Sequence, residues 1–91
     1  MLVYIIYKKN SDHERKVEEY VTMFRKIHPQ SQINLLEADS PKGLSFVNLY
    51  QITRYPTVLV IRENGEYVNG WLDNEDLPLM DEVFSYLVNQ V

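Results

Sequence analysis

The pattern of apolar and polar residues divides the chain into short alternating elements. Residues 2–7 (LVYIIY) form an unbroken apolar and β-branched run, typical of a central strand buried on both faces. From about residue 12 to residue 27, apolar side chains recur every three or four positions, which predicts a helix with one apolar face. That face consists of Val17, Tyr20, Val21, Phe24 and Ile27. Pro29 predicts the end of this helix, because the residue before a proline disfavours helical backbone.

The second half of the chain predicts two more helices and three more strands. Strands are expected over residues 33–39, 57–62 and 67–72, with Asn64-Gly65 forming a type I′ hairpin turn between the last two. Asp39 or Ser40 is expected to cap a short helix that has Pro41 in its first turn. The inward side chains of that helix would be Leu44, Phe46, Val47 and Tyr50. A last helix is expected from Asn74, with an apolar stripe of Leu77, Met80, Val83, Phe84, Leu87 and Val88.

The resulting order is β-α-β-α-β-β-α, which predicts an α/β fold with a four-stranded mixed sheet. The first crossover is long enough to join parallel strands, whereas the tight hairpin makes the last two strands antiparallel. A chain of 91 residues is the size of one domain, so we expect residues 1–91 to form a single unit.

Composition narrows the possible partners. The net charge of −4 and the pI near 5.0 argue against nucleic acid, because phosphate binding needs a basic surface. No apolar run approaches the roughly 18 residues of a membrane span. The first residues lack a basic lead and a small-residue cleavage site, so they are not expected to be a signal peptide. We therefore expect a cytoplasmic protein that binds neither membrane nor nucleic acid.

The stretch from Tyr50 to Gly70 (YQITRYPTVLVIRENGEYVNG) resembles the helix end, proline loop and final hairpin of the thioredoxin family. The resemblance implies a thioredoxin-like fold close to glutaredoxin in size, with a cis bond between Tyr55 and Pro56. An ungapped alignment places the family's C-x-x-C motif on Ser11-Asp12-His13-Glu14. It places the family's buried acid on Ile5 and a nearby lysine on Leu35.

The chain contains no cysteine, so it has no thiolate to attack a disulfide. Thiol–disulfide exchange is therefore excluded. Ser11-x-x-Glu14 predicts a capping box, in which the Ser11 hydroxyl accepts from the Glu14 amide and the Glu14 carboxylate accepts from the Ser11 amide. A rival interpretation makes Ser11 a nucleophile with His13 as its base. A metal site at Asp12, His13 and Glu14 is a further alternative, but we expect no metal and no cofactor.

The resemblance also implies a binding surface, because the backbone before the family's proline pairs with an extended substrate or with glutathione. Trp71 follows a glycine that the family shares, Gly70, and the stretch from Trp71 to Leu77 is similar to the glutaredoxin segment that holds one end of glutathione. Trp71 itself could be a binding hot spot or could pack on the last helix. The predicted binding face consists of Ser11, Asp12, His13, Arg54, Tyr55, Pro56, Gly70 and Trp71.

These residues lead to three hypotheses for function. The first is a redox-inactive binding or adaptor domain that recognises an extended protein segment, or a second copy of itself, through this face. The second is a binder of a small ligand of the glutathione type. The third is an enzyme that uses Ser11, His13 or Glu14 in unrelated chemistry. The first hypothesis assigns no catalytic residue.

Overall fold

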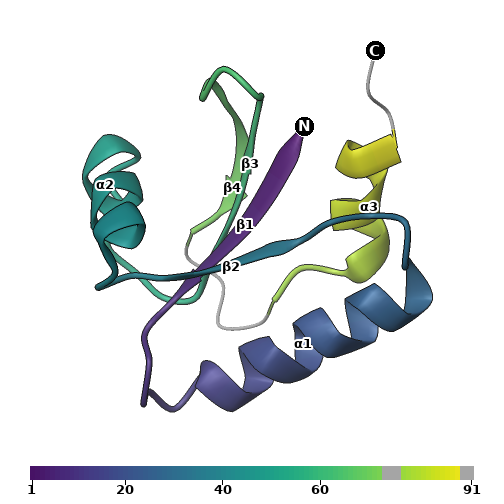
Figure 1. The fold of residues 1–91 in the computed structure, drawn as a ribbon, viewed down its shortest axis with the longest axis horizontal. Coiled ribbons are helices and arrows are strands. Elements are labelled where there is room, and N and C mark those ends of the chain that lie inside the picture. Colours follow the sequence, from purple (N-terminus) through teal and green to yellow (C-terminus); the bar gives the residue numbers. More distant parts are fainter. Residues whose placement is uncertain (73–76, 89–91) are drawn as a thin grey trace.

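The computed structural model describes residues 1–72 and 77–88, and the elements follow the predicted order (Figure 1). They are β1 (Leu2–Tyr7), α1 (Glu14–Ile27), β2 (Asn34–Glu37), α2 (Pro41–Leu49), β3 (Thr57–Ile61), β4 (Tyr67–Trp71) and α3 (Met80–Val88). Within the described part of the chain, no helix is both long enough and apolar enough to cross a membrane.

The four strands form one mixed sheet in the order β2-β1-β3-β4. β1 runs parallel to β2, with Ile5 opposite Leu35, and antiparallel to β3, with Ile5 also opposite Val58. β3 and β4 are antiparallel. Figure 1 shows α2 on one face of the sheet and α1 with α3 on the other. The predicted α/β class and mixed four-stranded sheet are therefore confirmed.

Alternation along the strands divides the core between the two faces of the sheet. On the α1/α3 face the buried side chains are Val3, Ile5, Val17, Val21, Phe24, Ile33, Val58, Val60 and Val83. On the α2 face they are Ile6, Leu36, Ala38, Ile52, Leu59 and Ile61. The two central strands are thus apolar on both sides, which explains why their sequences show no polar alternation.

The predicted apolar face of α1 is wrong at its last member. Val17, Val21 and Phe24 are buried, but Ile27 is 53% exposed. His28 continues the same line of contacts instead, because it lies four residues after Phe24. Its ring stacks on Phe84 at a centroid distance of 3.7 Å and lies 5.2 Å from the ring of Phe24.

In α2 the predicted cap is confirmed at Ser40, whose hydroxyl accepts a hydrogen bond from the Gly43 amide at 3.0 Å. The prediction that Leu44 faces inward is wrong, since this side chain is 49% exposed. The helix touches the end of β2 through Gly43, where an added Cβ would lie 1.9 Å from the Glu37 carbonyl oxygen. This close approach turns Leu44 aside, whereas Phe46, Val47 and Tyr50 pack against the α2-face core.

The predicted type I′ turn at Asn64-Gly65 is wrong. Gly65 has a φ of +92°, but Asn64 is not among the residues with positive φ. The turn is longer: the Gly65 amide donates to the Arg62 carbonyl at 2.9 Å, and the Arg62 amide donates to the Glu66 carbonyl at 2.8 Å. The Asn64 side chain accepts from the Glu66 amide at 3.0 Å. Because this side-chain bond supports the loop, only one residue needs left-handed backbone.

The last helix begins later than predicted. Residues 77–79 are not helical and α3 starts at Met80, while the predicted start at Asn74 lies outside the described residues. Pro78 explains the delay, because a proline disfavours helical backbone in the residue before it. The Tyr20 hydroxyl donates to the Pro78 carbonyl at 2.8 Å, which ties this segment to α1. Burial, reinforced by Glu82, raises the pKa of Tyr20 to about 12.

Candidate functional site

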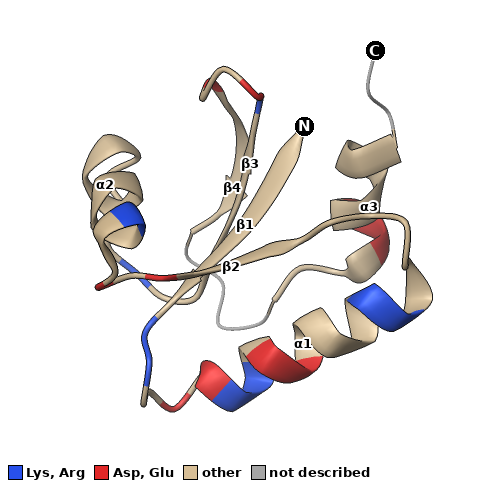
Figure 2. Ribbon diagram, viewed as in Figure 1, with Lys and Arg blue, Asp and Glu red and all other residues tan. Residues whose placement is uncertain are grey.

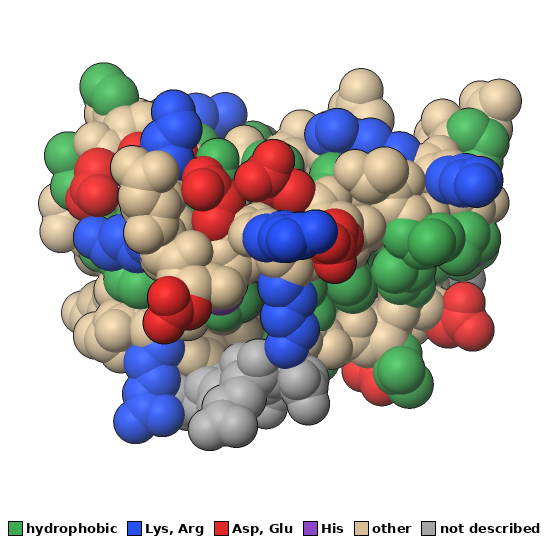
Figure 3. Space-filling view, turned by 90° about the horizontal axis from the view of Figure 1, so that it is seen from below, with side chains coloured by type: hydrophobic (Ala, Val, Ile, Leu, Met, Phe, Trp, Pro, Cys, Tyr) green, Lys and Arg blue, Asp and Glu red, His purple; other side chains and the backbone are tan. Residues whose placement is uncertain are grey.

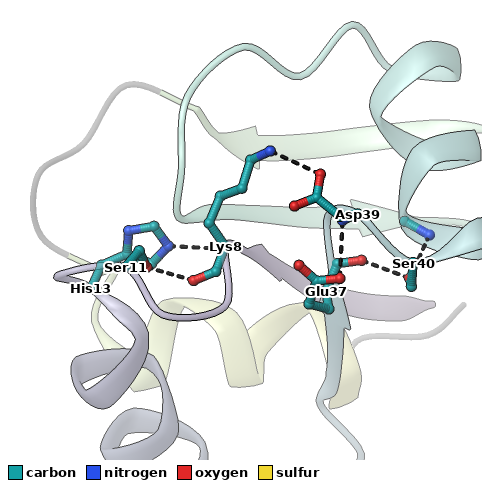
Figure 4. Close-up of polar contacts among 7 residues, drawn as sticks. Lys8, Ser11, His13, Glu37, Asp39 and Ser40 are labelled. Carbon is teal, nitrogen blue, oxygen red and sulfur yellow. Dashed lines mark hydrogen bonds and ion pairs between the residues drawn. The ribbon is translucent and has the colours of Figure 1, made fainter.

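Two connections lie side by side at one end of the sheet and frame the candidate site. β1 and β2 are parallel, with Tyr7 opposite Glu37, so Lys8 and Asp39 leave the sheet close to one another (Figure 4). β3 runs antiparallel to β1, with Thr57 opposite Ile6, so the proline loop enters the sheet at the same end. The topology thus brings residues 8–13, 37–40 and 54–56 together.

The connection from β1 to α1, residues 8–13, is held by its own hydrogen bonds. The Lys8 amide donates to His13 Nε2 at 3.0 Å, and the Ser11 hydroxyl donates to the Lys8 carbonyl at 2.5 Å. Asn10 adopts left-handed backbone with a φ of 60°, and its amide donates to Glu14 Oε1 at 3.2 Å. Asparagine accepts this conformation more readily than most residues. Both polar groups of the Lys8 backbone are therefore bonded within the loop.

The predicted capping box at Ser11 and Glu14 is wrong. The helix is preceded by His13, which makes no side-chain cap, and the Ser11 hydroxyl is a donor to Lys8 rather than an acceptor from Glu14. The Glu14 carboxylate does reach back, but to Asn10 instead of Ser11. The Glu14 amide donates instead to the backbone carbonyl of Ser11, at 3.3 Å.

His13 is neutral in this arrangement. An imidazole nitrogen that accepts a hydrogen bond carries no proton, so the ring proton is on Nδ1. Burial lowers the pKa of His13 below its ordinary value of 6.5, and the nearby Asp12 and Glu14 carboxylates oppose this effect only in part. His13 and Ser11 therefore both serve the Lys8 backbone, and the arrangement does not pair them as a base and a nucleophile.

The Lys8 side chain connects loop 8–13 to the proline loop, residues 54–56. Its ammonium lies 3.0 Å from an Asp39 carboxylate oxygen and 5.1 Å from the centroid of the Tyr55 ring. The hydrogen bond that Lys8 donates to the Asp39 carboxylate raises the pKa of Lys8, so its ammonium stays charged. Neither Lys8 nor Asp39 was among the predicted site residues. Their positions within two residues of the ends of two parallel strands could have revealed them, because such strands end at the same edge.

The proline loop combines a buried and an exposed side. The Tyr55–Pro56 peptide bond is cis, and Pro56 is buried. Tyr55 is half-buried against the α2-face core, and Arg54 is exposed. The fully buried Thr57 donates its hydroxyl to the Arg54 carbonyl at 2.6 Å, which closes a turn around the proline. Arg54 therefore lies on the surface of the loop, and Tyr55 is partly exposed beside it.

Gly70 and Trp71 lie in the edge strand β4 and are joined to the other site residues through the sheet, with Trp71 opposite Val58. Trp71 is half-buried against the α1/α3-face core, and its ring meets that of Tyr86 edge-on at 6.0 Å. Packing on the last helix is thus the interpretation that the structure favours for Trp71. Residues 73–76 of the glutaredoxin-like stretch lie outside the described residues.

The two positions aligned with the family's acid and lysine are also neighbours. Ile5 and Leu35 are opposite each other in β1 and β2 and belong to the same apolar core. Ile5 is fully buried. An apolar pair thus stands where the resemblance places two charged groups that assist thiol chemistry.

One hollow away from the candidate site is lined by a single helix. This hollow of about 550 Å³ lies on the outer side of α1, but its lining consists only of exposed side chains of that helix: Arg15, Glu18, Glu19, Thr22, Met23 and Lys26. No second element forms an opposite wall. Figure 3 shows acidic and basic side chains mixed over this face. Among the described residues, no three His, Asp or Glu side chains gather as a metal site would require.

Comparison with known proteins identifies the architecture. No family model and no curated protein matches the chain. Among solved structures, thioredoxin 1 from Thermosipho africanus TCF52B superposes with a TM-score of 0.64 over 94% of this chain and 89% of its own, at 12% identity. A proposed disulphide isomerase from Bacteroides thetaiotaomicron gives a TM-score of 0.67 over 99% of this chain and 78% of its own, at 19% identity.

The chain has a thioredoxin-like fold. With that fold, residues 8–13 occupy the connection before α1 to which the alignment assigned the redox motif. The chain has no cysteine anywhere, so this thioredoxin-like structure carries no thiol–disulfide chemistry of its own.

Proposed function

We propose that this protein is a redox-inactive binding domain that recognises an extended protein segment through the face around Tyr55 and Pro56. The observation that carries the proposal is the use of Ser11 and His13. Both side chains are bonded to the backbone of Lys8, so the polar groups at the former redox position maintain a surface. A catalytic pair would need its nucleophile and base bonded to each other.

The chemistry of this face supports an extended peptide as the partner. Recognition of an extended chain depends on free backbone and on shape, neither of which needs a cysteine. Half-buried Tyr55 supplies an aromatic surface, while Lys8 and Arg54 supply cations beside it. Aromatic residues and arginine are enriched at the energetic centres of interfaces. A second copy of this chain could occupy the same face as an alternative protein partner. We also propose that the protein is cytoplasmic.

The test begins with selection of binders from a displayed library of random linear peptides, followed by Kd measurement with one synthesised peptide. Arg54→Glu reverses the charge at the contact and should weaken peptide binding about tenfold. Charges of the wrong sign at an interface reduce affinity on this scale. Arg62→Glu is the matched control. Arg54 precedes β3 and Arg62 follows it, so two exposed arginines sit at opposite ends of one strand.

Equal loss of affinity in both variants would mean that the peptide responds to net charge alone and would contradict the proposal. Sedimentation of the wild-type protein tests the second-copy alternative, because a dimer formed through this face should dissociate when the peptide is added. Competition by reduced glutathione would favour the small-ligand hypothesis instead. Trp71→Ala is unsuitable as a binding probe, since its packing against the core predicts a stability loss of about 3 kcal/mol.

A further inference from the structure

The bond between His13 and Lys8 links a titratable ring to the candidate binding face. His13 Nε2 accepts the Lys8 amide at 3.0 Å, and the side chain of the same lysine reaches both Asp39 and the Tyr55 ring. Figure 4 shows the imidazole on one side of the Lys8 backbone and the ammonium extending to the other. A change at the ring therefore acts on the residue that connects loop 8–13 to the proline loop.

We propose that His13 is a proton-operated latch that holds Lys8 in place at neutral pH and releases it when the ring is protonated. The latch rests on the proposed function only for its effect on binding. Its chemistry follows from the hydrogen bond: an imidazolium has donors on both nitrogens and no acceptor, so it repels the Lys8 amide that the neutral ring accepts. A lost acceptor leaves that amide without its partner, which favours a rearranged loop.

The surroundings of the ring agree with a latch that is closed at neutral pH. Burial disfavours the charged imidazole and lowers the pKa of His13, whereas Asp12 and Glu14 favour the charged form. These are the charged groups that act on the ring among the described residues. Lys8, the residue that follows β1, directs its ammonium toward Asp39 and not toward the imidazole ring. The ring should thus be neutral at pH 7.5 and protonated only below pH 6.5.

Nuclear magnetic resonance of the free protein between pH 7.5 and pH 5.0 tests the latch without any ligand. The Lys8 amide and the Tyr55 ring resonances should shift together as pH falls. The midpoint of both shifts should equal that of the His13 imidazole and should lie below pH 6.5. The amide of Val60, which is fully buried in β3, serves as an internal reference. In His13→Gln, the side-chain oxygen can still accept the Lys8 amide, so the same resonances should stay constant with pH.

A Lys8 amide that does not follow the His13 titration would overturn the latch. A Lys8 amide that shifts while the Tyr55 ring does not would also overturn it, because the change would end within the loop. With the selected peptide as the probe, affinity should fall about tenfold from pH 7.5 to pH 5.0, a common size for coupling between two sites. His13→Gln should abolish that fall. Failure to select any peptide would contradict the proposed function alone, since the resonance measurements decide the latch by themselves.

Discussion

Two connections at the same end of the sheet lead into their helices with different hydrogen bonds. The short one, from β2 to α2, uses Ser40 as a cap: its hydroxyl accepts from Gly43 and donates to the Glu37 carbonyl. The long one, from β1 to α1, has the stronger capping sequence, Ser11-x-x-Glu14, yet His13 precedes the helix without a side-chain cap. Its polar side chains hold the loop together instead.

The difference shows that a capping motif forms only when the connection places the hydroxyl within reach of the helix amide. In the short connection the hydroxyl meets the helix amide and the strand carbonyl at once. In the long connection Asn10 turns the backbone into the left-handed region, which brings Ser11 under the Lys8 carbonyl. Figure 2 shows that charged residues follow both strands, and Lys8 and Asp39 join the two connections. The long connection is thus built as part of a surface.

The largest expected effect concerns the short connection, where space is lacking. In Gly43→Ala the new Cβ would lie 1.9 Å from the Glu37 carbonyl oxygen, so α2 or the end of β2 must move. We expect a loss of about 3 kcal/mol in the free energy of unfolding, measured by urea denaturation. Asn10→Gly in the long connection is the matched control. Its positive φ suits glycine, so its stability should change by less than about 0.5 kcal/mol. A mild effect of Gly43→Ala would show that the two elements can separate freely.

The two serines should differ when each is replaced by alanine. Ser40→Ala removes a helix cap and should cost about 1.5 kcal/mol. Ser11→Ala removes one partly exposed hydrogen bond to a loop carbonyl and should cost about 0.5 kcal/mol. Urea denaturation of both variants under the same conditions measures the difference. If Ser11→Ala proved as costly as Ser40→Ala, the hydroxyl of Ser11 would have to act as a cap after all.

A smaller effect should appear as a dependence of stability on pH. The pKa of His13 is lowered in the folded state, so between that value and 6.5 the unfolded state binds more protons. The stabilisation by the neutral ring is therefore complete above pH 6.5 and is lost as pH falls through the folded-state pKa. His13→Gln should reduce the loss of stability between pH 7.5 and pH 5.0, measured by urea denaturation at both values. An unchanged pH dependence would mean that other groups account for it.

The sequence predicted the fold well because the signals were redundant. The apolar run of β1, the helical period of α1 and the proline loop before β3 each indicate one element, and the buried residues confirm them. The ends and the inward faces of helices were less predictable where they depend on a single residue. Pro78 delays α3, and Gly43, not Leu44, faces the end of β2, so Leu44 is exposed.

Several residues of the candidate site were predicted from the sequence, but their hydrogen bonds were not. Pro56 was found through the resemblance, and Ser11 and His13 through the alignment. The direction of each hydrogen bond depends on how the loop folds, which no local pattern encodes. The ion pair between Lys8 and Asp39 joins residues 31 positions apart in sequence, so it follows from strand order and not from a motif.

The central position of β1 also has a consequence for synthesis and folding. β1 precedes the other strands of the sheet in the chain but lies in its middle, and its Leu2 pairs with Ile61 of β3, far along the chain. Such high contact order slows folding, because a long loop must close before its contacts stabilise it. A nascent chain that ends before residue 61 would hold an apolar strand with one edge unpaired. During translation, β1 therefore keeps an unpaired apolar edge until β3 has emerged from the ribosome.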